Sequence, residues 1–85
     1  EAMRIDVTAK DIEAGERQSF YSCPIAIAAG RTLKYPIVEP ERIWWKEHSW
    51  NEVYRVRVLP PVAVEFIRCF DSGRPVRPFS FEVQE

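Results

Sequence analysis

The sequence predicts an α+β fold: a four-stranded, mainly antiparallel sheet with two helices on one face, in the β-α-β-β-α-β order of the ferredoxin-like plan. Three observations lead to this prediction. Apolar and polar residues alternate near both ends of the chain, as they do in half-buried strands. Residues 61–71 carry apolar side chains at helical spacing. Residues 42–47 and 53–58 have the composition of two strands that a turn-rich loop connects.

A first strand and a short helix are expected near the N-terminus. Residues 4–8 alternate polar and apolar side chains, which predicts a strand with one buried face. Thr8 is a suitable N-cap for a helix over residues 9–14, and Asp11 can complete a capping box three residues later. Gly15 is expected to end this helix in the left-handed conformation, which favours a residue without Cβ.

A second short helix is expected over residues 24–29. Pro24 would occupy its first position and Gly30 its end, which is the usual asymmetry of helix termini. No charged residue lies between them, and a helix that is apolar on every side is buried. Pro36 and Pro40 then bracket a stretch that we expect to be irregular.

The adjacent residues Trp44 and Trp45 are the most informative feature of the expected strand 42–47. Neighbouring strand residues point to opposite faces, so one indole can enter the core while the other lies on the far face. In so small a protein that far face is expected to be surface. Residues 47–52 are polar and rich in turn formers, which predicts a hairpin loop.

The C-terminal half should supply the rest of the core. Residues 53–58 alternate tyrosine or valine with arginine, which predicts one core face and one basic face carrying Arg55 and Arg57. A helix over residues 61–71 and an alternating strand over residues 79–83 follow. The predicted core consists of Ile5, Val7, Ile25, Ala28, Tyr54, Val56, Val58, Phe66, Phe70, Phe79 and Phe81.

Length and composition indicate one small folded domain over residues 3–85, with Glu1 and Ala2 ahead of Met3 as a cloning remnant. Of the 85 residues, 46% are hydrophobic and 29% are charged, which is ordinary for a globular protein. The net charge of −1 argues against strong non-specific attraction to nucleic acid or to an anionic membrane. No apolar run approaches the ~20 residues that span a bilayer, and we expect a cytoplasmic protein.

The sequence predicts neither catalysis nor a metal site. Cys23 precedes Pro24 at an expected helix start, where the helix dipole lowers a thiol pKa, but a nucleophile also needs a base and His48 is the single histidine. We favour a structural cap for Cys23, and we expect both it and Cys69 to be reduced. Neither a glycine-rich phosphate loop nor a Cys/His ligand spacing occurs. The prediction is a non-enzymatic protein without a cofactor.

One pattern resembles a known group of proteins. It consists of Asp11-Ile12 and Gly15, followed by Cys23-Pro24-Ile25-Ala26 and Ala28. This resembles small uncharacterised bacteriophage and prophage proteins, and the resemblance extends to Phe70-Asp71, Gly73 and Pro78-Phe79-Ser80-Phe81. It leaves the tryptophan region unmatched and transfers no catalytic residue. It implies an accessory protein that works in the cytoplasm of a bacterial host.

The favoured hypothesis is recognition of a host or phage protein, because exposed tryptophan and arginine dominate the hot spots of protein interfaces. The predicted binding face is the hairpin that carries Trp44, Trp45, His48, Trp50, Arg55 and Arg57. The same residues would also support a homodimer through an open sheet face.

Two alternatives stay open. Arginines beside an exposed indole are typical of sheets that bind single-stranded nucleic acid, and Arg74 and Arg77 would extend that surface. Against this alternative, the RNA-recognition consensus is missing and the net charge is slightly negative. In the other alternative, two of the three indoles belong to the core and the third covers a loop.

Overall fold

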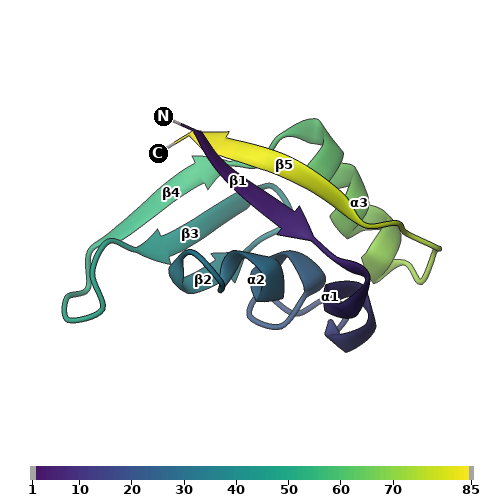
Figure 1. The fold of residues 1–85 in the computed structure, drawn as a ribbon, viewed down its shortest axis with the longest axis horizontal. Helices are drawn as coiled ribbons and strands as arrows, with labels where there is room; N and C mark the ends of the chain where they lie inside the picture. The colour runs from purple at the N-terminus through teal and green to yellow at the C-terminus, as the bar shows by residue number, and fades with distance from the viewer. Residues whose placement is uncertain (1, 85) are drawn as a thin grey trace.

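Three helices and five strands make up the computed structural model, which describes residues 2–84 (Figure 1). In chain order they are β1 (Ala2–Val7), α1 (Ala9–Ala14), α2 (Pro24–Ala29), β2 (Lys34–Val38), β3 (Arg42–Lys46), β4 (Tyr54–Val58), α3 (Pro61–Asp71) and β5 (Phe79–Gln84). The α+β class is therefore confirmed. None of the described helices is long and apolar enough to cross a membrane.

The strands form two antiparallel sheets rather than one. β1 and β5 pair along their whole length as a two-stranded ribbon, and β2, β3 and β4 form a three-stranded sheet in that order. The two sheets approach each other at one end, where Arg57 Nε donates a hydrogen bond of 2.9 Å to the carbonyl of Gln84. The prediction of one four-stranded sheet with two helices is wrong, and the ferredoxin-like order is not confirmed.

The additional strand, β2, lies where the sequence predicted an irregular stretch. Pro36 lacks a backbone N–H and disfavours a central strand, but β2 is at the edge of its sheet, where one side needs no ladder partner. The register with β3 shifts between Lys34 and Ile37, which marks a bulge. Within this bulge Tyr35 has a φ of 52°, the left-handed region that a residue with a side chain seldom adopts.

The caps of the helices agree in part with the sequence. Thr8 caps α1: its hydroxyl accepts from the Asp11 N–H at 3.2 Å, and the Asp11 carboxylate accepts from the Thr8 N–H at 2.8 Å, so the predicted capping box is confirmed. Gly15 was expected to be left-handed, which is wrong, because its φ is −72°. Glycine is required at this position for a different reason: a Cβ there would lie only 2.5 Å from Cδ of Pro24.

The core lies between the ribbon and the three-stranded sheet, with α1 and α2 below β1 in Figure 1 and α3 behind β5. Of the predicted core residues, Ile5, Val7, Ile25, Ala28, Phe66 and Phe81 are buried, and Phe70 and Phe79 are partly buried against them. The prediction is wrong for Tyr54, Val56 and Val58, which are exposed. Their strand, β4, turns its other face towards the interior.

The register of β3 and β4 explains this difference. Ile43 and Trp45 are the buried residues of β3, and their partners on β4 are Arg57 and Arg55. Directly opposed residues of an antiparallel pair project to the same side of the sheet. The arginine face of β4 therefore shares the side of the core, and the tyrosine and valine face is left outside.

Candidate functional site

The structure separates the two adjacent tryptophans as the strand alternation requires. Trp45 is buried in the core with 6% of its surface exposed. Trp44 is half-buried on the opposite side of the three-stranded sheet, where its Nε1 donates a hydrogen bond of 2.9 Å to a Glu39 carboxylate oxygen. Of the pair, only Trp44 is placed to contact a partner.

The two predicted arginines do not lie beside Trp44. Arg57 faces the buried indole, with its guanidinium carbon 6.0 Å from the centre of the Trp45 ring. Arg55 lies on the same side, where its Nε is 3.5 Å from a Glu47 carboxylate oxygen. The two arginines and the half-buried indole of Trp44 are thus on opposite sides of one sheet.

His48 and Trp50 lie in the hairpin loop between β3 and β4, at one end of the molecule (Figure 1). Their rings stack with centroids 4.4 Å apart and an interplanar angle of 8°. Trp50 is 78% exposed, so this stack covers little of the rest of the protein. The sequence prediction placed these two residues with Trp44 on one hairpin, but the stack is a separate feature at its tip.

The side of the three-stranded sheet that carries Trp44 is an apolar surface that is exposed along β4, and we call it the outer sheet face. Ile37, Trp44 and Val56 are direct cross-strand partners and form a row across all three strands. Tyr54 and Val58 lie on either side of this row along β4, and Val58 is 76% exposed. Sequence reasoning noticed this alternation but assigned it to the core.

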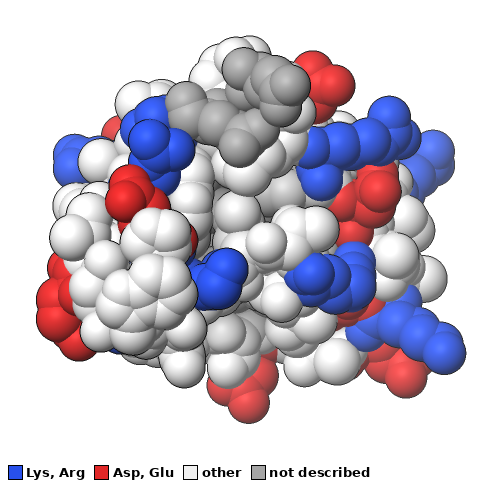
Figure 2. Space-filling model, turned by 60° about the vertical axis from the view of Figure 1, so that its left-hand side comes forward, with Lys and Arg blue, Asp and Glu red and all other residues white. Residues whose placement is uncertain are grey.

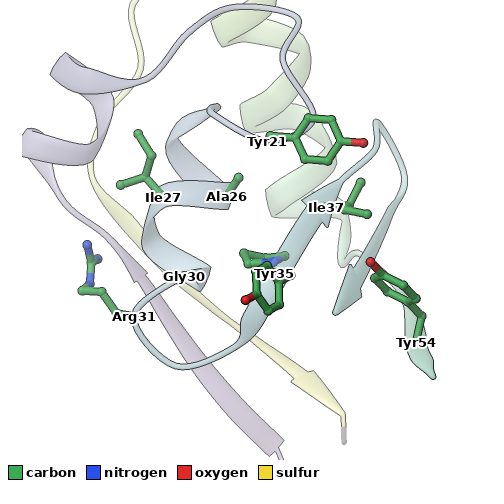
Figure 3. A pocket seen from close by; sticks show the side chains of 9 residues that line it. Tyr21, Ala26, Ile27, Gly30, Arg31, Tyr35, Ile37 and Tyr54 are labelled. Atoms are coloured by element: carbon green, nitrogen blue, oxygen red, sulfur yellow. The ribbon is translucent and has the colours of Figure 1, made fainter. Parts of the chain in front are cut away.

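A pocket of about 610 Å³ opens between α2 and β2 and adjoins the outer sheet face through Ile37 and Tyr54. All three tyrosines of the chain, Tyr21, Tyr35 and Tyr54, line it (Figure 3). Ala26 and Ile27 of α2 contribute apolar wall on the other side. We call this the tyrosine pocket. Sequence reasoning missed it, because the three tyrosines are far apart along the chain and share no local pattern.

Tyr35 is the strained member of this pocket. Its left-handed backbone conformation costs about 1–2 kcal/mol for a residue with a side chain. The residue is 61% exposed, so burial offsets little of that cost. The ammonium of Lys46 lies 4.9 Å from the centre of the Tyr35 ring and 5.9 Å from that of Tyr54. These cation–π contacts place the Lys46 ammonium beside both rings at the edge of the pocket.

Charges of both signs are interspersed over the face seen in Figure 2, with uncharged side chains between them. No large patch of one sign forms there. Within residues 2–84, no group of three or more His, Cys, Asp or Glu side chains is placed to hold a metal ion. This face therefore offers no large positive patch to a polyanion.

The most perturbed acid, Asp11, is buried at the junction of α1 and α2, away from these surfaces. Both of its carboxylate oxygens accept hydrogen bonds from Arg31, at 2.8 and 2.7 Å. The guanidinium, together with the Thr8 bonds, lowers the pKa of Asp11 from 3.8 to about 2. This arrangement joins the two helices, and we assign it to stability.

Cys23 has the position of a structural cap. Its sulfur accepts a hydrogen bond of 3.4 Å from the Ala26 N–H at the start of α2, and burial raises the pKa of its thiol. A raised pKa keeps the thiol protonated, which is the opposite of what a nucleophile needs. His48, the base considered with it, lies on the hairpin tip.

Comparisons with protein-family models, with curated proteins and with solved structures found no match to this chain. The similarity to phage and prophage proteins therefore stays a prediction.

Proposed function

We propose that this protein is a small non-enzymatic binding module that recognises another protein through its outer sheet face. The observation that carries the proposal is the row of Ile37, Trp44 and Val56, in which Val56 is exposed and the other two are half-buried. An uncovered sheet face with apolar side chains is unfavourable in water and favours a partner. In keeping with the phage-like pattern in the sequence, the proposed partner is a host or phage protein in a bacterial cytoplasm.

The alternative of single-stranded nucleic acid has less support. Such sheets place arginine or lysine beside exposed aromatic rings, so that phosphates and bases bind together. Here Arg55 and Arg57 are on the side of the buried Trp45, and the half-buried Trp44 is on the other side of the sheet. An apolar partner surface fits the outer sheet face better than a phosphate backbone does.

The proposal can be tested by photo-crosslinking and affinity capture from nuclease-treated bacterial lysate. The variant Val56→Lys, Val58→Lys places two charges on the outer sheet face. Val53→Lys, Val62→Lys is a matched control, because it makes the same change at two other exposed valines, one before β4 and one on α3. We expect the control to retain the captured protein and the outer-face variant to lose it.

A partner that is a second copy of the chain would appear as a dimer in sedimentation, lost in the outer-face variant alone. Recovery of nucleic acid without protein would contradict the proposal. Equal capture by the two variants would also contradict it.

A further inference from the structure

The tyrosine pocket has the size and lining of a specific binding site. Its volume of about 610 Å³ falls within the range of about 300–1,000 Å³ that is common for ligand sites. The close view shows that Tyr21, Tyr35 and Tyr54 come from three separate segments, while Ala26 and Ile27 lie on α2 (Figure 3). No hydrogen bond of their hydroxyl groups to another part of residues 2–84 is present, so these groups remain able to donate to a ligand.

The cations nearest this pocket are Arg31, which is held by both carboxylate oxygens of Asp11, and the two lysines at its edge. Arg31 is the charged residue in the lining, and the Lys46 ammonium lies against the Tyr35 and Tyr54 rings. Lys34 is the direct cross-strand partner of Lys46, and like charges in this relation repel. Glu52 offsets part of the charge of Lys46 at 3.4 Å, but Lys34 forms no ion pair among the described residues. An anion bound here would relieve the repulsion between the two lysines.

The geometry of the rings selects the group that enters. Flat tyrosine faces stack on another aromatic ring with an attraction beyond that of buried area alone. The strained backbone of Tyr35 presents its ring at the pocket while leaving most of it exposed. The pocket also shares Ile37 and Tyr54 with the outer sheet face, so one partner can contact both.

We propose that the tyrosine pocket receives an aromatic side chain from an acidic segment of the partner protein, whose flanking carboxylates contact Lys34 and Lys46. This inference rests on the proposed function, because it specifies the partner of the same surface. The apolar row provides contact area. The pocket and the lysines at its edge favour a partner segment in which an aromatic residue is flanked by acidic ones.

The test is a titration of the isotope-labelled protein with four capped pentapeptides, followed by backbone amide shifts in NMR. The first peptide has phenylalanine between two pairs of glutamates. The others replace the phenylalanine by alanine, the glutamates by glutamines, or the glutamates by lysines. We expect the first peptide to shift amides around Tyr21, Ile27, Ile37 and Tyr54, the alanine and glutamine peptides to bind more weakly, and the lysine peptide to leave these amides unchanged.

Two variants examine the pocket itself. Tyr35→Gly removes the ring at a position whose positive φ suits glycine, so the fold should persist. This variant should lower the affinity for the first peptide by about tenfold or more. Lys34→Glu should weaken it too, and should reduce the difference between the glutamate and glutamine peptides. Phe20→Ala and Lys10→Glu remove an exposed ring and reverse a charge outside the pocket, and they should bind as the parent protein does.

Several results would overturn the inference. These are the absence of pocket shifts with every peptide, equal binding of the alanine and phenylalanine peptides, or stronger pocket shifts with an oligothymidylate than with the first peptide. Peptide shifts along Trp44 and Val56 without any at the pocket would reject the pocket and leave the proposed function standing. Loss of lysate capture in the outer-face variant can be measured independently of these titrations.

Discussion

β4 and β5 have the same kind of sequence, but the apolar face is buried in β5 and exposed in β4. Both alternate large apolar residues with polar ones. In β5 the apolar set is turned inward, with Phe81 and Val83 buried and Phe79 stacked on Phe66 of α3 at a centroid distance of 4.7 Å. In β4 the corresponding set faces outward, and Val58 is 76% exposed.

The difference arises from what each strand is paired with. β5 pairs with β1, and α3 packs against its apolar side. β4 pairs with β3, whose buried side carries Ile43 and Trp45. The cross-strand partners of these two residues are the arginines of β4, which therefore lie on the same side of the sheet. An alternating pattern therefore establishes that two faces differ, but the neighbouring elements decide which face is covered. The uncovered apolar face of β4 is the part that a partner protein would complete.

The largest expected effect compares the two strands directly. Phe81→Ala on β5 should lower the free energy of unfolding by ~3–5 kcal/mol, because it leaves a cavity in a packed region. Val56→Ala on β4 should lower it by less than about 1 kcal/mol, because the side chain is already partly in water. Urea denaturation of both variants measures the difference. Similar losses in the two would mean that the outer sheet face is covered in solution.

The next prediction concerns the loss of folding stability in acid, which should depend on a buried carboxylate and not on the outer sheet face. The pKa of Asp11 is lowered to about 2 in the folded state, from an ordinary value of 3.8. A lowered folded pKa contributes stability above the unfolded pKa, and this contribution is lost as the pH falls from about 4 to about 2. The shift corresponds to a free energy on the order of 2 kcal/mol.

This loss would be seen in unfolding free energies measured from pH 5 to pH 2 at intervals on the order of one pH unit. The variant Asp11→Asn should have lower stability at neutral pH and a flatter profile over the acid range. The same slope in the variant and in the parent would assign the acid sensitivity to other carboxylates.

The smallest expected effect is at the tyrosine pocket. Tyr35→Gly relieves the left-handed strain but loses the cation–π contact with Lys46 and gains backbone freedom in the unfolded chain. These terms oppose one another, so we expect stability within about 1 kcal/mol of the parent. Tyr35→Ala retains the strain and loses the ring, and it should be the less stable variant in thermal denaturation. A glycine variant clearly less stable than the alanine variant would show that the left-handed strain at this position is smaller than the entropy cost of glycine.

Several features of the fold could be predicted from the sequence because they depend on neighbours along the chain. The capping box of Thr8 and Asp11 needs one helical turn, and α3 follows from apolar residues at helical spacing. Strand alternation placed one indole of the Trp44–Trp45 pair inside and the other outside. These arrangements are set by backbone geometry within a few residues, and tertiary contacts did not override them.

Other features were decided by tertiary structure alone. Pro36 argued against a strand, yet an edge position allowed β2. Edge position is a property of the whole sheet. The separation of Arg55 and Arg57 from Trp44 followed from the pairing of β3 with β4, and the meeting of Tyr21, Tyr35 and Tyr54 followed from the packing of α2 beside β2.

The sequence by itself determined the caps, the helical and strand periods and the existence of an apolar face on β4, because each depends on short-range geometry. The three-dimensional packing decided which faces are buried and which side chains share a surface. Burial depends on which elements pair and cover one another, and in this chain those elements are far apart in sequence, as β1 and β5 are.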